Sequence, residues 1–153
     1  MPRRLSLAFA TFLLFSLLGC EPGVLRPGLW LSGEDVTTPV TDWSFTAPHQ
    51  DIYLETSTWY GIPHSVTIWG VEHGGEFYIG SYDETKTWEG HVARNPDATL
   101  RIDGKLYEIT TELIEDPALN SAVFETYEQK YDMEATFGDE VPEWWFYRVA
   151  SRG

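Results

Sequence analysis

The sequence predicts a single, mainly β domain with helices, in which an antiparallel sheet closes into a small barrel. Three observations indicate this α+β class: short segments alternate apolar and polar residues, an Asp-Gly pair joins two long alternating arms, and two helical segments interrupt the strands. The 153 residues, 42% of them hydrophobic, suffice for one core. Closing the sheet would remove its exposed edges, with the helices packed at one end.

The first strands are expected in residues 51–81. DIYLETST (51–58) and HSVTIWGV (64–71) each alternate apolar and polar residues, and a Gly-Ile-Pro turn separates them. VEHGGEFYIGS (71–81) is typical of a hairpin, because its two adjacent glycines permit positive φ.

The strongest hairpin signal lies in residues 98–113. Asp103-Gly104 separates two alternating arms there, and this pair suits a two-residue hairpin turn. A final strand, WWFYRVA (144–150), is rich in aromatic residues, which favour a pleated, half-buried surface.

Two helices are expected between these strands. Residues 85–96 place apolar side chains four apart and stop at an Asn-Pro pair. The second helix begins after Asp116, a capping residue, with Pro117 at its first position. Its apolar stripe recurs every four residues, at Leu119, Val123, Tyr127 and Tyr131.

The charge of the chain excludes some partners. It has 24 acidic and 10 basic residues, a formal net charge of -14. Such an excess repels the phosphates of nucleic acids and anionic membrane surfaces. We therefore expect no nucleic-acid partner.

Residues 1–19 are typical of a signal peptide. Arg3 and Arg4 precede an apolar run over residues 5–18. As a helix this run would cover roughly 20 Å, less than the hydrocarbon core of about 30 Å that a membrane span must cross.

The end of this segment, Leu17-Leu18-Gly19-Cys20, resembles the lipobox of bacterial lipoproteins. The resemblance implies cleavage after Gly19 and a membrane anchor of acyl chains on Cys20, followed by a linker (20–27) and the domain (28–153). The alternative is a buried free thiol, but a cysteine followed by Glu-Pro-Gly has no core to enter. Glu21 favours the outer membrane of the cell envelope over the inner one, and Sec and twin-arginine export both stay open.

Three stretches of the domain look like the split β-barrel superfamily of pyridoxamine phosphate oxidase-like and deazaflavin-dependent proteins. They are GIPHSVTIW (61–69), the segment from Glu76 to Glu108, and EDPALNSAVFETYEQKYD (115–132). The resemblance implies a split antiparallel barrel with two or three helices, and a homodimer with FMN or a deazaflavin in a cleft between subunits.

The same resemblance implies three cofactor-binding residues. Ser81 and Lys86 match the hydroxyl and the cation that hold the phosphate, and His64 matches a basic residue on the second strand. Asp83 and Glu84 precede Lys86, so two carboxylates would face a phosphate there and weaken its binding. Each of the three also has a plain structural interpretation: a solvated lysine paired with an acidic neighbour, a serine satisfying its own turn, and a surface histidine.

Other site chemistry is less favoured by the sequence. The four histidines, His49, His64, His73 and His91, lack the spacing that places two metal ligands on one helix face, so we expect no metal. Among the seven tryptophans, Trp43 and Trp59 are the candidates for a ligand pocket, because they lie in or beside loop-like segments.

Three functions therefore compete. The first is an oxidoreductase that uses a flavin or deazaflavin. The second is a non-enzymatic lipoprotein whose barrel binds another planar ligand. The third is a lipid-anchored protein whose surface binds a protein partner.

Overall fold

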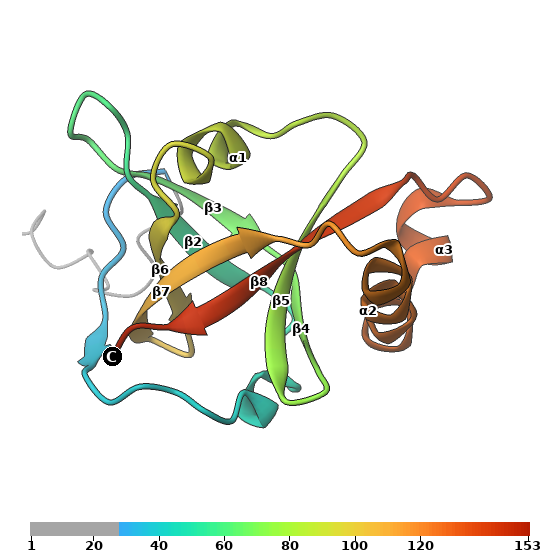
Figure 1. Cartoon of the computed structure of the whole chain (residues 1–153), viewed down its shortest axis with the longest axis horizontal. Helices are drawn as coiled ribbons and strands as arrows, with labels where there is room; N and C mark the ends of the chain where they lie inside the picture. The colour runs from blue at the N-terminus through green and yellow to red at the C-terminus, as the bar shows by residue number, and fades with distance from the viewer. Residues whose placement is uncertain (1–27) are drawn as a thin grey trace, which may run out of the picture.

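The structure is a computed structural model that describes residues 28–153 (Figure 1). The predicted signal peptide, the Cys20 anchor and the linker lie outside the described residues. Within those residues, no helix combines the length and the apolar character needed to cross a membrane.

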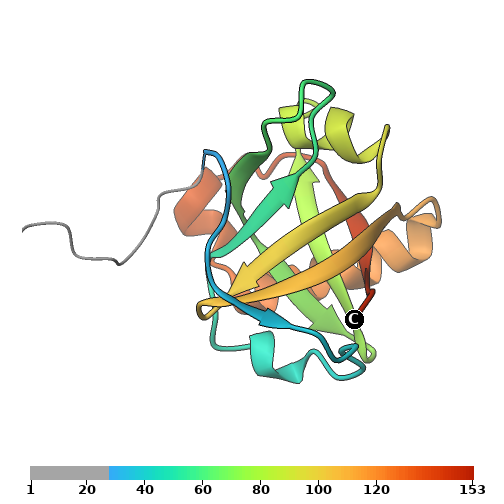
Figure 2. The same ribbon diagram turned by 90° about the vertical axis from the view of Figure 1, so that its left-hand side faces the viewer.

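One curled antiparallel sheet forms the body of the molecule, which confirms the predicted α+β split-barrel class. Its strands follow the order β3-β2-β6-β7-β8-β5-β4, and β1 adds to β7 in parallel. In Figure 2 the β6–β7 hairpin crosses in front of β5 and β8, so the sheet curls back on itself. The strands are β1 (Glu34–Val36), β2 (Ile52–Thr56), β3 (His64–Ile68), β4 (Gly70–His73), β5 (Glu76–Tyr82), β6 (Asp97–Ile102), β7 (Lys105–Leu113) and β8 (Trp144–Ser151).

The segment 64–71 differs from its prediction, because it forms two strands instead of one. β3 pairs with β2 and β4 pairs with β5, at opposite ends of the strand order. Trp69 joins them, and its carbonyl accepts the Gly80 N–H at 3.3 Å. The chain thus passes directly from one edge of the curled sheet to the other, and alternation along the sequence cannot show such a change of partner.

The β6–β7 hairpin is confirmed at its predicted turn. Asp103 and Gly104 have φ values of 49° and 76°. Positive φ at both central residues gives the turn a twist that matches the strands it joins. β8 matches its predicted segment, whereas the three-residue β1 has no counterpart in the sequence-based expectations.

The helices are α1 (Thr87–Val92), α2 (Pro117–Lys130) and α3 (Met133–Phe137), and a single 3₁₀ turn spans Ser44–Thr46. α2 begins as predicted, with the Asp116 carboxylate accepting the Ala118 N–H at 2.9 Å. α2 and α3 lie together at one end of the sheet (Figure 1), whereas α1 is shorter than predicted and lies over β2 and β3.

The core has two parts on either side of the sheet. The interior of the barrel holds aliphatic side chains from β2, β6 and β7 together with Phe77 and Trp88. The second part lies between α2 and strands β4, β5 and β8. The predicted stripe of α2 enters it, because Val123 and Tyr127 are fully buried.

Candidate functional site

A cleft of about 650 Å³ lies between β3, the end of β5, the start of α1, and the arm formed by α3 and the start of β8. Its polar lining includes His64, Ser81, Glu84 and Lys86. The structure therefore brings the three cofactor-binding candidates, His64, Ser81 and Lys86, to one cleft, although they come from three different segments. Their role as ligands stays a prediction.

Five large aromatic side chains contribute to the walls of the cleft. They comprise Trp69, Tyr82, Trp88, Phe137 and Trp144. The rings of Tyr82 and Trp144 lie 4.7 Å apart between centroids, and Phe137 meets Tyr82 edge-on at 4.9 Å. Such contacts fix the orientation of each ring. Trp88 and Trp144 are only 4% and 5% exposed, so Trp69, Tyr82 and Phe137, which are half-buried, offer most of the apolar ring surface to a flat ligand.

Trp69 joins β3 to β4, at the point where the chain passes from one edge of the sheet to the other, and its ring is firmly held. Its indole stacks on Tyr131 of α2 at 4.3 Å with an interplanar angle of 5°, and it is also parallel to Trp144 at 6.2 Å. The Tyr131 hydroxyl donates to the Gln50 carbonyl at 2.9 Å. Burial raises the pKa of Tyr131 to about 12, so this hydroxyl keeps its proton.

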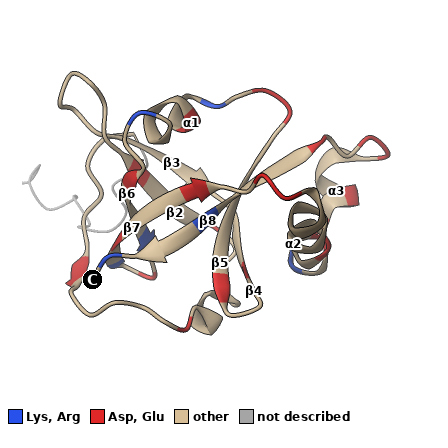
Figure 3. Cartoon of the chain, in the orientation of Figure 1, with Lys and Arg blue, Asp and Glu red and all other residues tan. Residues whose placement is uncertain are grey.

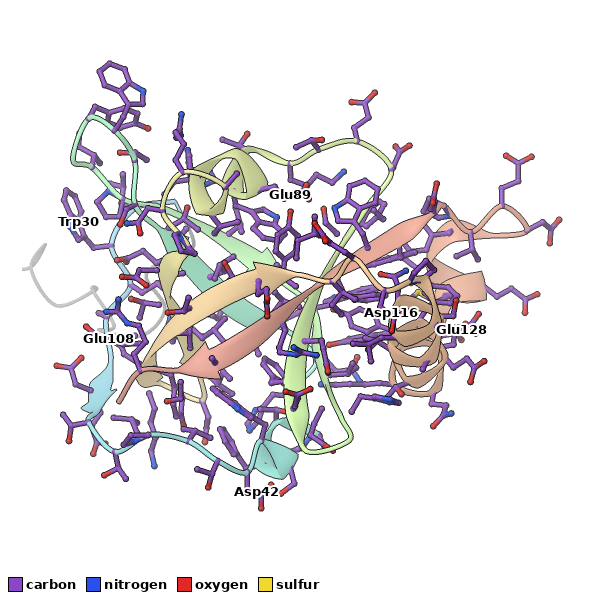
Figure 4. The ribbon with its side chains drawn as sticks, viewed as in Figure 1. Trp30, Asp42, Glu89, Glu108, Asp116 and Glu128 are labelled. Carbon is purple, nitrogen blue, oxygen red and sulfur yellow. The ribbon has the colours of Figure 1, made fainter. Side chains whose placement is uncertain are left out.

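The hydroxyl of Ser81 is committed to a neighbouring carboxylate. Ser81, the residue before the last in β5, is buried and donates to Glu89 Oε2 at 2.9 Å. The backbone N–H of Lys86 donates to the same oxygen at 2.5 Å. Glu89 lies on the side of α1 turned toward the sheet (Figure 4), where only 3% of the residue is exposed.

The other oxygen of Glu89 binds two side chains of β8. Oε1 accepts a hydrogen bond from Tyr147 Oη at 3.0 Å and another from Trp145 Nε1. Burial, and then the neighbouring Glu89 carboxylate, raises the pKa of Tyr147, so Tyr147 is the donor of its pair. The carboxylate thus accepts four hydrogen bonds, which is the arrangement that a buried charge requires.

Lys86 is the cation of the cleft. Its Nζ lies 4.4 Å from the centroid of the Tyr82 ring, a cation–π contact. Figure 3 shows the basic position before α1 next to an acidic stretch of the same loop, as the sequence Asp83-Glu84-Thr85-Lys86 requires. None of the ion pairs within residues 28–153 involves Lys86.

Two histidines meet behind the cleft. The rings of His64 and His91 pack edge-to-face at 5.3 Å, and His91 Nδ1 hydrogen-bonds Thr56 Oγ1 at 2.8 Å. Burial, then His64 and then Arg94, lowers the pKa of His91. His64 Nδ1 is buried with no hydrogen-bond partner in the described part of the chain.

Neither tryptophan expected at a pocket lines this cleft. Trp43 is 3% exposed and stacks on Phe77 at 5.1 Å, so it fills the barrel core instead of covering a pocket. Its flanking residues are loop-like, as predicted, and a single 3₁₀ turn follows it. Trp59 lies at the β2–β3 loop with 82% of its surface exposed and meets only the edge of Tyr60 among the aromatic rings described.

The sequence reasoning missed the residues that form the walls. Tyr82, Phe137 and Trp144 were not candidates for the site, and neither was Glu89. One signal was present: Tyr82 directly follows the hairpin predicted over residues 71–81, and Trp144 begins the predicted final strand. The two are direct partners in the β5–β8 pairing. Within residues 28–153, no group of three or more His, Cys, Asp or Glu side chains is placed to hold a metal ion. The expectation of no metal stays a prediction.

A comparison with family models gives one match, to a family described as "Uncharacterized protein conserved in bacteria (DUF2255)", over residues 46–143. The chain belongs to this family. The matched segment runs from the 3₁₀ turn to the start of β8 and so includes His64, Ser81, Glu89 and Lys86. No curated protein matches this DUF2255 chain in sequence.

Solved structures show that this DUF2255 member shares its fold with other split barrels. A candidate pyridoxamine 5'-phosphate oxidase from Listeria innocua superimposes with a TM-score of 0.51 at 17% identity, covering 69% of this chain and 86% of its own. A candidate 5-nitroimidazole antibiotic resistance protein from Bacteroides thetaiotaomicron gives 0.54 at 12% identity, covering 87% and 93%. HutZ, the heme storage protein of Vibrio cholerae, gives 0.52 at 7% identity, covering 71% and 87%.

The cleft fits one part of an FMN-type cofactor and not the other. Its aromatic walls suit a planar ring. The donors that the resemblance assigns to the phosphate do not fit, because Ser81 and the Lys86 N–H already bind the Glu89 carboxylate. The arrangement therefore favours a flat ligand held mainly by apolar contact.

Proposed function

We propose that the cleft binds a planar ring system of the flavin or deazaflavin type. The observation that carries the proposal is the aromatic lining, with Trp69 and Trp144 parallel to each other and Tyr82 fixed against Trp144. The volume of about 650 Å³ lies within the usual range for ligand sites, roughly 300 to 1,000 Å³.

Oxidoreductase activity is the consequence proposed for a bound flavin, since such a ring supplies electron or hydride transfer. The residues of this chain would hold and orient the ring: the aromatic side chains by stacking, and Lys86 by placing a positive charge at its edge. Fold likeness alone does not imply a reaction, so the proposal depends on the binding measurement below.

We further propose a homodimer that is anchored in the bacterial cell envelope. The split-barrel superfamily that the chain resembles places its cofactor between two subunits, and a dimer would add a second wall to the cleft. The anchor would be acyl chains on Cys20, with the outer membrane favoured by Glu21. These two assignments are supported by the resemblances of the sequence.

The proposal predicts that Tyr82→Ala weakens the binding of riboflavin by about tenfold, because it removes one aromatic wall. Quenching of tryptophan fluorescence and the shift of the flavin absorbance band measure the affinity. Tyr60→Ala is the matched control, since Tyr60 is exposed on the β2–β3 loop and does not line the cleft.

The proposed homodimer is tested separately. Light scattering over a range of protein concentrations measures the oligomeric state, and the flavin titration is repeated at the same concentrations.

The absence of any spectral change with riboflavin, FMN and a deazaflavin would contradict the proposal. An unchanged affinity of Tyr82→Ala for riboflavin would show that the ring does not bind against the aromatic walls of the cleft.

A further inference from the structure

In the split-barrel proteins that this chain resembles, a ligand phosphate would lie at Ser81 and Lys86. In this chain the buried carboxylate of Glu89 lies beside these two residues. Glu89 Oε2 accepts the Ser81 hydroxyl at 2.9 Å and the Lys86 backbone N–H at 2.5 Å. A hydroxyl and a backbone N–H are the donors that a phosphate would need at this place. In this chain both are bound to a side chain of the protein itself.

The carboxylate cannot leave this place easily. Its other oxygen is bound by Tyr147 and Trp145 of β8, and only 3% of Glu89 is exposed. A rotation of Glu89 would leave several buried donors without acceptors, which costs more than the loss of an exposed hydrogen bond. Glu89 is therefore a fixed negative charge at the start of α1.

The surrounding charges do not compensate for Glu89. Lys86 Nζ lies against the Tyr82 ring, and Asp83 and Glu84 precede it in the same loop. A phosphate group, which carries a charge near -2 at neutral pH, would meet Glu84 and Lys86 of the cleft lining and the Glu89 carboxylate behind Ser81. Like charges at short distance in a partly buried site repel strongly.

We propose that Glu89 takes the place of a ligand phosphate, and that the cleft therefore selects a flavin-type ring whose side chain carries no phosphate. The inference rests on the proposed function for the ring itself. Glu89 acts through Ser81 and Lys86 as a positioning residue that sets specificity, so its substitution must change the choice between ligands and not only the stability of the fold.

The first experiment compares riboflavin with FMN, which differ only by the phosphate. We expect wild-type protein to bind riboflavin at least about tenfold more tightly than FMN at low salt. In Glu89→Gln the amide oxygen can still accept from β8, while its NH₂ group turns the Ser81 hydroxyl toward the cleft. The preference should then fall to about threefold or less, chiefly through tighter binding of FMN.

Glu125→Gln is the matched control, because Glu125 is exposed on α2 and the substitution changes the net charge equally. It should leave the preference unchanged. FMN binding as tightly as riboflavin to the wild-type protein would overturn the inference, and this comparison holds even if Glu89→Gln fails to fold.

The second experiment uses inorganic phosphate and needs no ring. Phosphate should raise the thermal midpoint of Glu89→Gln above the value in chloride of equal ionic strength, and should leave the wild type unchanged. An equal response of the two proteins would overturn the role of Glu89. If no flavin binds the wild type, the proposed function fails, whereas the phosphate response still decides whether Glu89 occupies the anion position.

Discussion

Lys130 shows at the residue scale how burial changes the chemistry of a side chain. Its Nζ donates to the Gly70 carbonyl at 2.8 Å and to the Thr46 carbonyl at 3.2 Å, so it ties the end of α2 to β4 and to the 3₁₀ turn. Burial lowers the pKa of Lys130 from 10.5 to about 8. The ammonium form is therefore less favoured in the folded chain than in the unfolded one.

This shift predicts that stability rises with pH between about 8 and about 10, because the unfolded chain holds a proton on Lys130 that the folded chain has lost. Lys130 is half-buried, so we expect a rise of at most about 1 kcal/mol after screening by solvent. Urea unfolding at several pH values measures it. Lys130→Met should flatten the rise, and Lys105→Met, at an exposed position on β7, should not.

The rise in stability must end above pH 10, because the pKa shift of Tyr131 has the opposite effect on stability. Burial raises its pKa to about 12 from 10.0, so the unfolded chain loses this proton first and stability falls. If the unfolding free energy of a Lys130→Met variant rose with pH between about pH 8 and 10 as steeply as in the wild type, Lys130 would not be the cause of the rise.

At the scale of elements, β5 brings the aromatic walls together with the core beneath α2. Gly80 lies within this strand, and an added Cβ would be 2.9 Å from Phe146, 2.9 Å from the Tyr127 hydroxyl and 3.0 Å from Trp144. These neighbours are rings in a packed layer and have little room to shift. The absence of a side chain at Gly80 thus lets α2 and β8 approach β5.

Gly80→Ala should consequently destabilise the protein by about 1 to 3 kcal/mol, as over-packing usually does. Gly90→Ala is the comparison, since nothing lies within 4 Å of its added Cβ and α1 should gain about 0.5 to 1 kcal/mol in stability. Thermal and urea unfolding of the two variants test the difference. Equal stability of both would show that the layer between β5, β8 and α2 is looser than the contacts indicate.

The whole molecule is an acidic body, with Asp and Glu on most of its loops and helices and few Lys or Arg (Figure 3). Such a surface has no attraction for anionic lipid. An exposed Trp30 lies near the start of the described chain (Figure 4). Attachment to a membrane would therefore depend on the acyl chains predicted at Cys20, outside the described residues.

The anchor is tested by producing the protein with its own leader in bacterial cells. Wild type should stay with the membrane after an alkaline wash, and its intact mass should show cleavage before Cys20 with added acyl chains. Cys20→Ser should be released or should keep its leader. A free Cys20 thiol in the wild-type protein would contradict the prediction.

Local signals made a large part of the fold predictable. Asp103-Gly104, the Asp116 cap and the stripe through Val123 and Tyr127 act over a few residues, and each is confirmed. The passage of the chain at Trp69 from one edge of the sheet to the other was not predictable in this way. Nothing within a short window tells which strand will be the neighbour of β3 or of β4.

The sequence by itself determined the α+β class, the β6–β7 hairpin and the start of α2, because turn geometry, capping and periodicity depend on neighbours along the chain. Only the tertiary structure decided that Trp43 fills the core, that Trp144 lines the cleft, and that Glu89 binds Ser81. Glu89 meets Trp145 and Tyr147 across more than fifty residues, and such contacts exist only once the sheet has curled and set its strand order.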